Sequence, residues 1–169
     1  HATDARQIVQ TLFSAHYPQA TGVIVSTAAG YVDLSDKLKF DPEQAKALLD
    51  DAGWKPGTSG IREKDGQPLV LTTYESLNYL QNKEVLQLVA QQWAQVGVRL
   101  NVLAGDLGSK TLDSLDPLKT PLIPAMVGRA DPDVIKSNYY PTNRNLLLQK
   151  GGVSQKVHSF VDDKLNGLL

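Results

Sequence analysis

The sequence predicts an α/β fold, with a mixed sheet flanked by helices, from the order of three segments. Residues 69–74 and 98–102 have the apolar enrichment and alternation of strands, and apolar residues recur at helical spacing between them. A strand, a helix and a second strand in this order form a βαβ unit with parallel strands. Short hairpin elements ahead of this unit complete the expectation of a layered α/β structure.

Near the start of the chain, apolar residues at helical spacing predict a helix that ends before Pro18. Residues 18–39, rich in small residues, are expected to form a long surface loop. The helical stripe consists of Ala5, Ile8, Val9, Leu12 and Phe13.

The stretch FDPEQAKALLDDAGW, residues 40–54, has the start and stop signals of a second helix. Asp41 can cap it, Pro42 suits the first helical position, and Gln44 sits where a capping-box partner belongs. Gly53 is expected to end it. The buried face is predicted to consist of Ala45, Leu48, Leu49 and Ala52.

A hairpin is expected next, because Asp65-Gly66 is a turn signal between residues 61–63 and 69–74. Pro68 lacks an N–H and places the start of the second strand at an end or edge. The charged run REKDG, residues 62–66, is interpreted as a solvated turn.

Asn82 is predicted to cap the long helix of the βαβ unit, and Gly97 to end it. Its apolar stripe consists of Val85, Leu88, Val89, Trp93 and Val96. Further elements are expected as a weak helix over 108–115, a strand near 123–127, a helix from Asp131 and a last helix after Gly152.

Composition excludes several classes of function. The 169 residues have a formal net charge of −1, so no basic field attracts nucleic acid. No apolar run approaches the ~20 residues that span a bilayer. The chain has no cysteine, which excludes disulfides and thiol catalysis. It opens without a signal-peptide pattern and is expected to be either cytosolic or a mature or trimmed product.

Several segments in a fixed order carry a resemblance to a known family. They are TDARQIVQTLF, FDPEQAKALLDDAGW followed by GIREKDGQPLVLT, NKEVLQLVAQQWAQVGVRLNV, and VGRADPD with the later FVDDKLNGLL. Together they span almost the whole chain. They resemble the extracytoplasmic solute-binding proteins of peptide and nickel ABC importers, solute-binding protein family 5.

The resemblance implies a lobe of a type II periplasmic-binding-protein-like fold. Because proteins of this family are longer and have two lobes joined by a hinge, residues 1–169 are expected to form a single α/β lobe, most of the C-terminal one. The implied function is to capture a peptide or similar small solute between two lobes and deliver it to the membrane permease of an ABC importer. A periplasmic or extracytoplasmic monomer without enzymatic activity or cofactor is expected.

The loop GRADPD follows a predicted strand, and open α/β sheets bind ligands at the carboxyl ends of strands. In peptide-binding members of the family an aspartate of this loop pairs with the ligand's amino group, and Asp131 is matched to it. Arg129 stands where an aromatic residue is often found, and it either neutralises Asp131 or binds a carboxylate itself. Alternatively, Asp131 or Asp133 caps the next helix.

Tyr74 is the third candidate for ligand contact, because it ends a predicted strand together with Glu75. Its ring and hydroxyl suit a ligand, although an ordinary packed tyrosine is the structural alternative. The three histidines, His1, His16 and His158, lack the spacing of metal ligands, so no metal site is expected.

Two other functions stay open as alternatives. One is a hydrolase that uses a carboxylate or a Ser/His site, although no Gly-x-Ser-x-Gly elbow, phosphate loop or dinucleotide fingerprint occurs. The other is a non-catalytic protein-interaction module, because a lobe of a binding protein also docks on its transporter.

Overall fold

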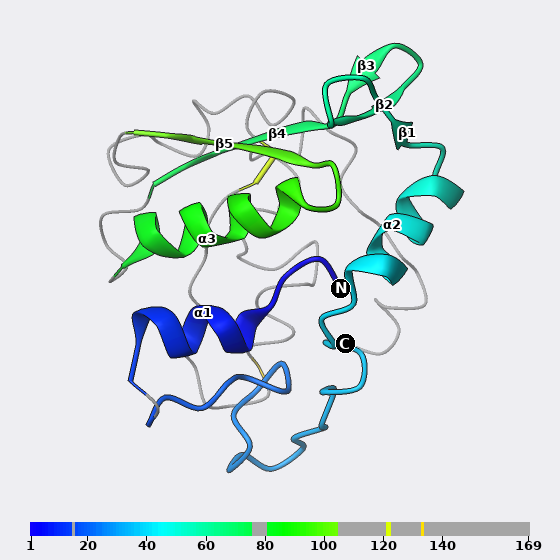
Figure 1. Ribbon diagram of the computed structural model, residues 1–169. Helices are drawn as coiled ribbons and strands as arrows, with labels where there is room; N and C mark the ends of the chain where they lie inside the picture. Colours follow the sequence, from blue (N-terminus) through cyan, green and yellow to red (C-terminus); the bar gives the residue numbers. More distant parts are fainter. Residues whose placement is uncertain (15, 76–80, 105–120, 123–132, 134–169) are drawn as a thin grey trace.

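The computed structural model of the chain describes residues 1–14, 16–75, 81–104, 121, 122 and 133 (Figure 1). The predicted segments at 108–115, 123–127 and after Gly152 lie outside these residues. The predicted helix from Asp131 also does, apart from Asp133, which is helical. The elements are α1 (Ala5–Leu12), α2 (Pro42–Asp51), β1 (Lys55–Pro56), β2 (Arg62–Lys64), β3 (Gln67–Pro68), β4 (Val70–Tyr74), α3 (Asn82–Ala94) and β5 (Arg99–Leu103).

The predicted βαβ unit is confirmed. β4 and β5 pair in parallel, with Tyr74 opposite Leu103 at their carboxyl ends. α3 connects them and lies along the sheet (Figure 1). Leu100 is buried whereas Arg99 and Asn101 are exposed, so β5 has the alternation expected of a half-buried strand.

The predicted turn at Asp65-Gly66 is also confirmed. Both residues have positive φ, 52° and 74°, as a two-residue turn that matches the twist of a hairpin requires. The turn joins β2 to β3, and β1 pairs with the other side of β2. Pro68 therefore lies in an edge strand, where its missing N–H costs no ladder bond.

The predicted partner of β2, residues 69–74, is wrong. Of the residues after the turn, only Gln67 and Pro68 form a strand paired with β2, and the chain changes sheets at Leu69. The Leu69 N–H donates to the Arg62 carbonyl at 2.7 Å, whereas the Leu69 carbonyl accepts from the Arg99 N–H at 3.1 Å. β4 consequently joins β5, and Leu71 of β4 packs against the buried core cluster.

Side chains cap the first two helices, and the cap at Asp41 confirms the prediction from the sequence. The Asp4 and Asp41 carboxylates accept the backbone N–H groups of Gln7 and Gln44, each at 2.9 Å. The return bond of a capping box is replaced by a tertiary contact, because the Asp41 N–H donates to the carbonyl of His1 at 2.9 Å.

The predicted cap of α3 is wrong by one residue. Asn82 is the first helical residue, and the cap position belongs to Gln81, which has a φ of 54° and makes no side-chain capping bond. The left-handed backbone of Gln81 turns the chain into the helix, so a side-chain cap is not what starts α3.

The buried face predicted for α2 is only half correct. Ala45 is buried and Leu49 partly buried, but Leu48 is 52% exposed and Ala52 is also exposed. α2 therefore meets the described core along one edge. Gly53 ends the helix as predicted, with a φ of 89°.

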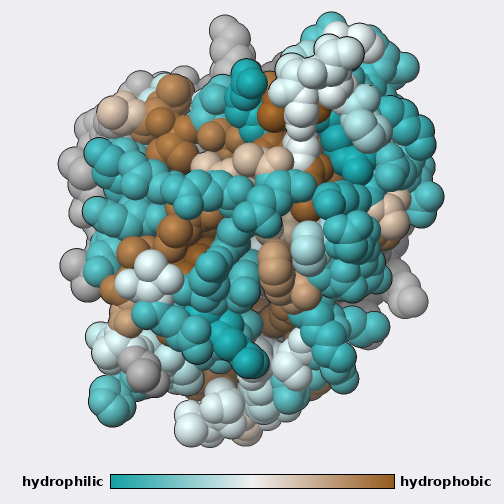
Figure 2. Space-filling view, viewed as in Figure 1, coloured by the Kyte–Doolittle hydropathy of each residue, from teal (hydrophilic) through white to brown (hydrophobic). Residues whose placement is uncertain are grey.

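The core lies where α2 meets α3 and the sheet. Leu71 of β4 and Trp93 of α3 pack against it, and an apolar hollow of about 340 Å³ opens beside them. Figure 2 shows apolar side chains reaching the surface over the sheet on this face of the molecule. The buried cluster consists of Ala45, Val96 and Val98.

The helices of the described part are all too short or too polar to span a bilayer.

Arg62 corrects the interpretation of REKDG as a solvated turn, because it is only 5% exposed. Its Nε donates to the Val96 carbonyl at 2.9 Å, and its Nη1 donates to the Trp54 carbonyl and to Asp50 Oδ1, both at 2.7 Å. Its backbone N–H donates to the Gly97 carbonyl at 2.8 Å. One buried guanidinium thus ties the hairpin, the end of α2 and the turn before β5 together.

Candidate functional site

The carboxyl ends of β4 and β5 form the first candidate site, because open α/β sheets bind ligands outside the carboxyl ends of their strands. Tyr74 and Leu103 are paired there. The N–H of Glu75 extends the pairing by donating to the Leu103 carbonyl at 3.1 Å. The backbone at this edge is therefore held in a defined position.

Of the predicted contact residues, the structure describes Tyr74, which is partly buried at the end of β4. Successive residues of a strand point to opposite faces, and Leu71 packs on the core with α3. Tyr74 therefore belongs to the face away from α3. Arg129 and Asp131 lie outside the described residues, and Asp133 is exposed. Ligand contact by the three predicted residues stays a prediction.

Sequence reasoning places Glu75 at this edge but does not identify it as a site residue. By the same alternation, Glu75 falls on the α3 side of the sheet, and its carboxylate lies 3.8 Å from Lys83 Nζ in the first turn of α3. The side chain of Glu75 is 14% exposed and that of Lys83 is 57% exposed. The alternation along the strand could have predicted the face on which Glu75 lies. It could not have predicted that the carboxylate is shielded, because the shielding comes from tertiary packing.

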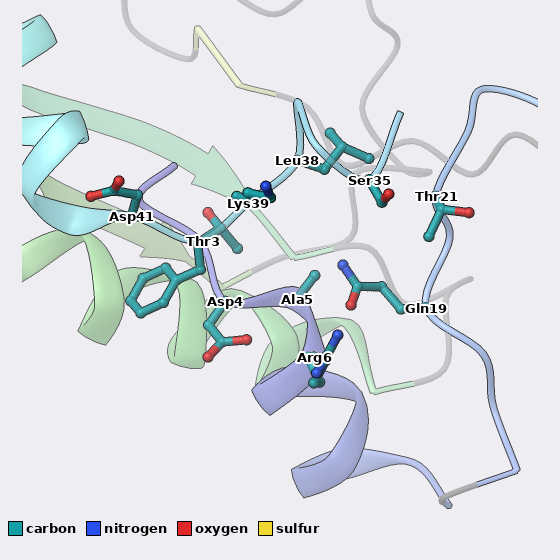
Figure 3. Close-up of a pocket in the computed structure, with 11 residues that line it drawn as sticks. Thr3, Asp4, Ala5, Arg6, Gln19, Thr21, Ser35, Leu38, Lys39 and Asp41 are labelled. Carbon is teal, nitrogen blue, oxygen red and sulfur yellow. The ribbon is translucent and has the colours of Figure 1, made fainter. Parts of the chain in front are cut away.

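A second candidate is a polar cavity of about 550 Å³ between the start of α1 and the loop that leads to α2. Figure 3 shows the side chains of Arg6 and Gln19 extending toward each other across it. No sequence motif predicts this cavity, because it forms only when the loop before α2 folds back to the start of α1. It is lined by residues 3–6, Gln19, Thr21, Ser35 and 38–41.

Most polar groups around this cavity are already bonded within the protein. Asp4 and Asp41 cap helices, and Thr21 Oγ1 shares a hydrogen bond of 2.5 Å with the Tyr31 hydroxyl. Lys39 pairs with Asp36, just outside the lining, at 2.7 Å. That hydrogen bond and the charge of Lys39 hold the pKa of Asp36 below its usual value. These groups secure the loop, so the strand ends are the better candidate for a ligand.

The described histidines make no contact of the kind that activates a nucleophile. His1 Nδ1 bonds to the Lys39 carbonyl at 2.9 Å, and only the backbone N–H of His16 approaches Ser14 Oγ, at 3.3 Å. Within the described ranges, no three His, Cys, Asp or Glu side chains are grouped as a metal would require.

Solved structures of similar fold were found among solute-binding proteins. NikA from Brucella suis, in complex with Fe(III)-EDTA, matches with a TM-score of 0.68 at 20% identity over 99% of this chain and 36% of that one. The oligopeptide-binding protein of Thermus thermophilus, complexed with a pentapeptide, matches with a TM-score of 0.73 at 19% identity, over 99% and 30%. These likenesses confirm the predicted α/β fold of the periplasmic-binding-protein type.

Curated proteins of similar sequence are also named as binding proteins. The glutathione-binding protein GsiB of Salmonella typhimurium is 29% identical over 113 residues, or 67% of this chain and 20% of that protein. GsiB of Escherichia coli strain K12 is 30% identical over 113 residues, with the same shares. The chain spans about a fifth of the length of these curated relatives.

The family model of the bacterial extracellular solute-binding proteins, family 5 Middle, matches residues 1–145. The match includes α1, α2, the hairpin and the whole βαβ unit. It also includes Tyr74, Arg129 and Asp131. The chain therefore belongs to family 5 of the bacterial extracellular solute-binding proteins.

Proposed function

We propose that this chain is part of the solute-binding component of an ABC importer, which captures a peptide or similar small solute outside the cytoplasm and delivers it to the membrane permease. The observation that carries the proposal is the match of residues 1–145 to a family named for extracellular solute binding. Such a protein binds its ligand and releases it unchanged. The hydrolase alternative has no described histidine placed to activate a serine, and it is not proposed.

Within the complete protein, residues 1–169 form one α/β lobe, and a second lobe closes over the solute by a hinge motion. The proposal is supported by coverage: the two solved structures match 99% of this chain but only 36% and 30% of their own chains. The complete protein is expected to be a monomer until it docks on the permease.

The carboxyl ends of β4 and β5 are proposed to face the solute. Tyr74 contributes a ring and a hydroxyl, and Asp131 and Arg129 contribute charges of opposite sign from the following loop. A peptide carries both an ammonium and a carboxylate, which these charges would complement. The described lining of Tyr74 and Glu75 supports this place because it is polar and positioned by the pairing with β5.

The test is to purify the complete protein under native conditions and identify the bound molecule by mass spectrometry, followed by calorimetric titration of the emptied protein with peptide pools. A co-purifying peptide or peptide-like solute, rebinding with one-to-one stoichiometry, is expected. Turnover of the bound molecule during incubation would contradict the proposal, because a solute receptor leaves its ligand intact.

The isolated chain of 169 residues is expected to bind the same solute more weakly, since half of the enclosing surface is missing. Calorimetry of the chain beside the complete protein measures the difference. Equal affinities would show that the site is contained in this lobe alone, which would contradict capture between two lobes.

A further inference from the structure

We propose that the Glu75 carboxylate binds a cationic group of the solute, an ammonium or a guanidinium, and that Lys83 is its counter-ion only while no solute is bound. This inference rests on the proposed function, because it assumes that a solute enters at the carboxyl ends of β4 and β5. It adds to that function a specificity residue and the chemical class of the group that it recognises.

The first observation is a shielded charge with a poor partner. The Glu75 side chain is 14% exposed, and the cation paired with it among the described residues, Lys83 Nζ, lies at 3.8 Å. A charge-assisted hydrogen bond between an ammonium and a carboxylate is about 2.7–2.9 Å long. Within the described part of the chain, no other side chain bonds this carboxylate. Burying a carboxylate away from water is costly unless it is hydrogen-bonded, so both oxygens are ready to accept from a donor that comes closer.

The second observation is that Lys83 is easily displaced. Its side chain is 57% exposed, so the ammonium can return to water at little cost. It also lies in the first turn of α3 (Asn82–Ala94), where the positive end of the helix dipole disfavours a cation. Neither solvent shielding nor the helix holds Lys83 against Glu75.

The third observation is the fixed direction of Glu75. Its N–H donates to the Leu103 carbonyl at 3.1 Å, which keeps its backbone at the end of the parallel pair. Alternation turns its side chain to the α3 side, opposite to that of Tyr74. A solute at this edge would therefore meet the Tyr74 ring on one side of the sheet and an anion on the other.

The chemistry of the site selects the class of ligand group. An ionised carboxylate only accepts hydrogen bonds, so its partner must be a donor, and its charge favours a cationic one. A metal ion would need further ligands, and the described residues hold no cluster of three that could supply them. An amino terminus and a lysine side chain provide an ammonium, whereas an arginine side chain provides a guanidinium.

The experiment compares the complete protein with its Glu75→Gln variant by calorimetric titration with four synthetic peptides. These are penta-alanine, its N-acetyl form, and N-acetylated peptides in which one alanine is replaced by lysine or by arginine. In the unmodified protein at least one cationic peptide is expected to bind about 10- to 100-fold more tightly than the uncharged one. Which of them does so identifies the source of the cation. In Glu75→Gln this preference is expected to disappear while the uncharged peptide binds as before.

Two further variants make the result specific. Glu84→Gln removes a carboxylate from the next, exposed position of the same helical turn and is expected to keep the preference. Lys83→Met removes the competing cation and is expected to strengthen binding of the preferred peptide about two- to fivefold. A purely structural ion pair would not produce that gain.

Three results would overturn the inference. Glu75→Gln could retain the preference for the cationic peptide, it could weaken all four peptides equally, or the unmodified protein could show no preference between charged and uncharged peptides. If the unmodified protein binds none of the four and yields no co-purifying solute, the proposed function fails as well, which distinguishes the two failures.

Discussion

Arg62 and Glu75 are both largely shielded from water, but the two charges differ in how closely their partners bind them. Arg62 donates three side-chain hydrogen bonds of 2.7–2.9 Å to groups from two separate segments. In the described part of the chain, Glu75 is paired with one lysine, at 3.8 Å. A charge held by several short hydrogen bonds is part of the framework, whereas a shielded charge with a loose partner is available for a ligand. The comparison predicts that substitutions at Arg62 affect folding and those at Glu75 affect binding.

The largest effect is expected from Arg62→Met, which leaves the carbonyls of Val96 and Trp54 without their donor. We expect the free energy of unfolding to fall by about 3 kcal/mol, since each unsatisfied buried group costs about 1–3 kcal/mol. Urea denaturation of the chain measures it. Arg99→Met, at an exposed position of β5, is the matched control and should change it by less than about 0.5 kcal/mol. If both variants lost the same free energy of unfolding, Arg62 would not be a residue that stabilises the fold.

Gly97→Ala tests the packing around the same guanidinium. Gly97 has a φ of 84°, and an added Cβ would lie 2.8 Å from Arg62 Cγ. Left-handed strain and this contact together should cost about 2 kcal/mol. Gly60→Ala is the control for backbone strain alone, because Gly60 has a φ of 79° and an added Cβ would meet nothing within 4 Å. It should lower the free energy of unfolding by about 1 kcal/mol. If both variants lose the same stability in urea, the hairpin moves freely relative to the turn before β5.

The same contrast explains what the sequence could predict. The cap at Asp41, the turn at Asp65-Gly66 and the alternation of β5 are each decided by a few adjacent residues, and all three are confirmed. The predicted partner of β2 is wrong because the exchange of bonds at Leu69 depends on β5, 30 residues further along the chain. The exposure of Leu48 likewise depends on how α2 is placed.

For the candidate site, the position of Tyr74 at the end of a strand follows from pattern alone. The burial of Arg62 and of Glu75 does not, because charged residues in a turn or after a strand are usually solvated. Tertiary packing decides both, and for Arg62 it includes the end of α2 and the turn before β5. Gly97 lies against the Arg62 side chain and leaves room for it. In the sequence, however, this glycine predicts only the end of a helix.

A smaller effect concerns Asp50, the half-exposed end of the Arg62 network. The hydrogen bond from Arg62 lowers the pKa of Asp50, opposed by partial desolvation and assisted by the charges of Arg62 and Lys55. A folded pKa below the usual 3.8 means that the ionised carboxylate contributes stability above pH 3.8 and loses it as the pH falls through the lower folded value. Asp50→Asn should therefore lower the Tm at pH 7 and flatten its decline below about pH 4.

Thermal unfolding between about pH 7 and pH 2 measures this difference. Asp51→Asn, at the exposed neighbouring position, is the control and should follow the unmodified chain. A parallel decline in all three proteins would mean that Arg62 gains its stability from the two carbonyls and not from Asp50.

The smallest effect on folding is expected from Glu75→Gln. The change removes a shielded charge but breaks no short hydrogen bond, and loosely held ion pairs contribute about 0–1 kcal/mol. We expect the free energy of unfolding in urea to change by less than about 0.5 kcal/mol, in either direction, while Arg62→Met loses several times as much under the same conditions. A loss of about 2 kcal/mol or more in Glu75→Gln would place Glu75 in the framework beside Arg62. In that case its distance from Lys83 would reflect packing, and the carboxylate would not be free for a solute.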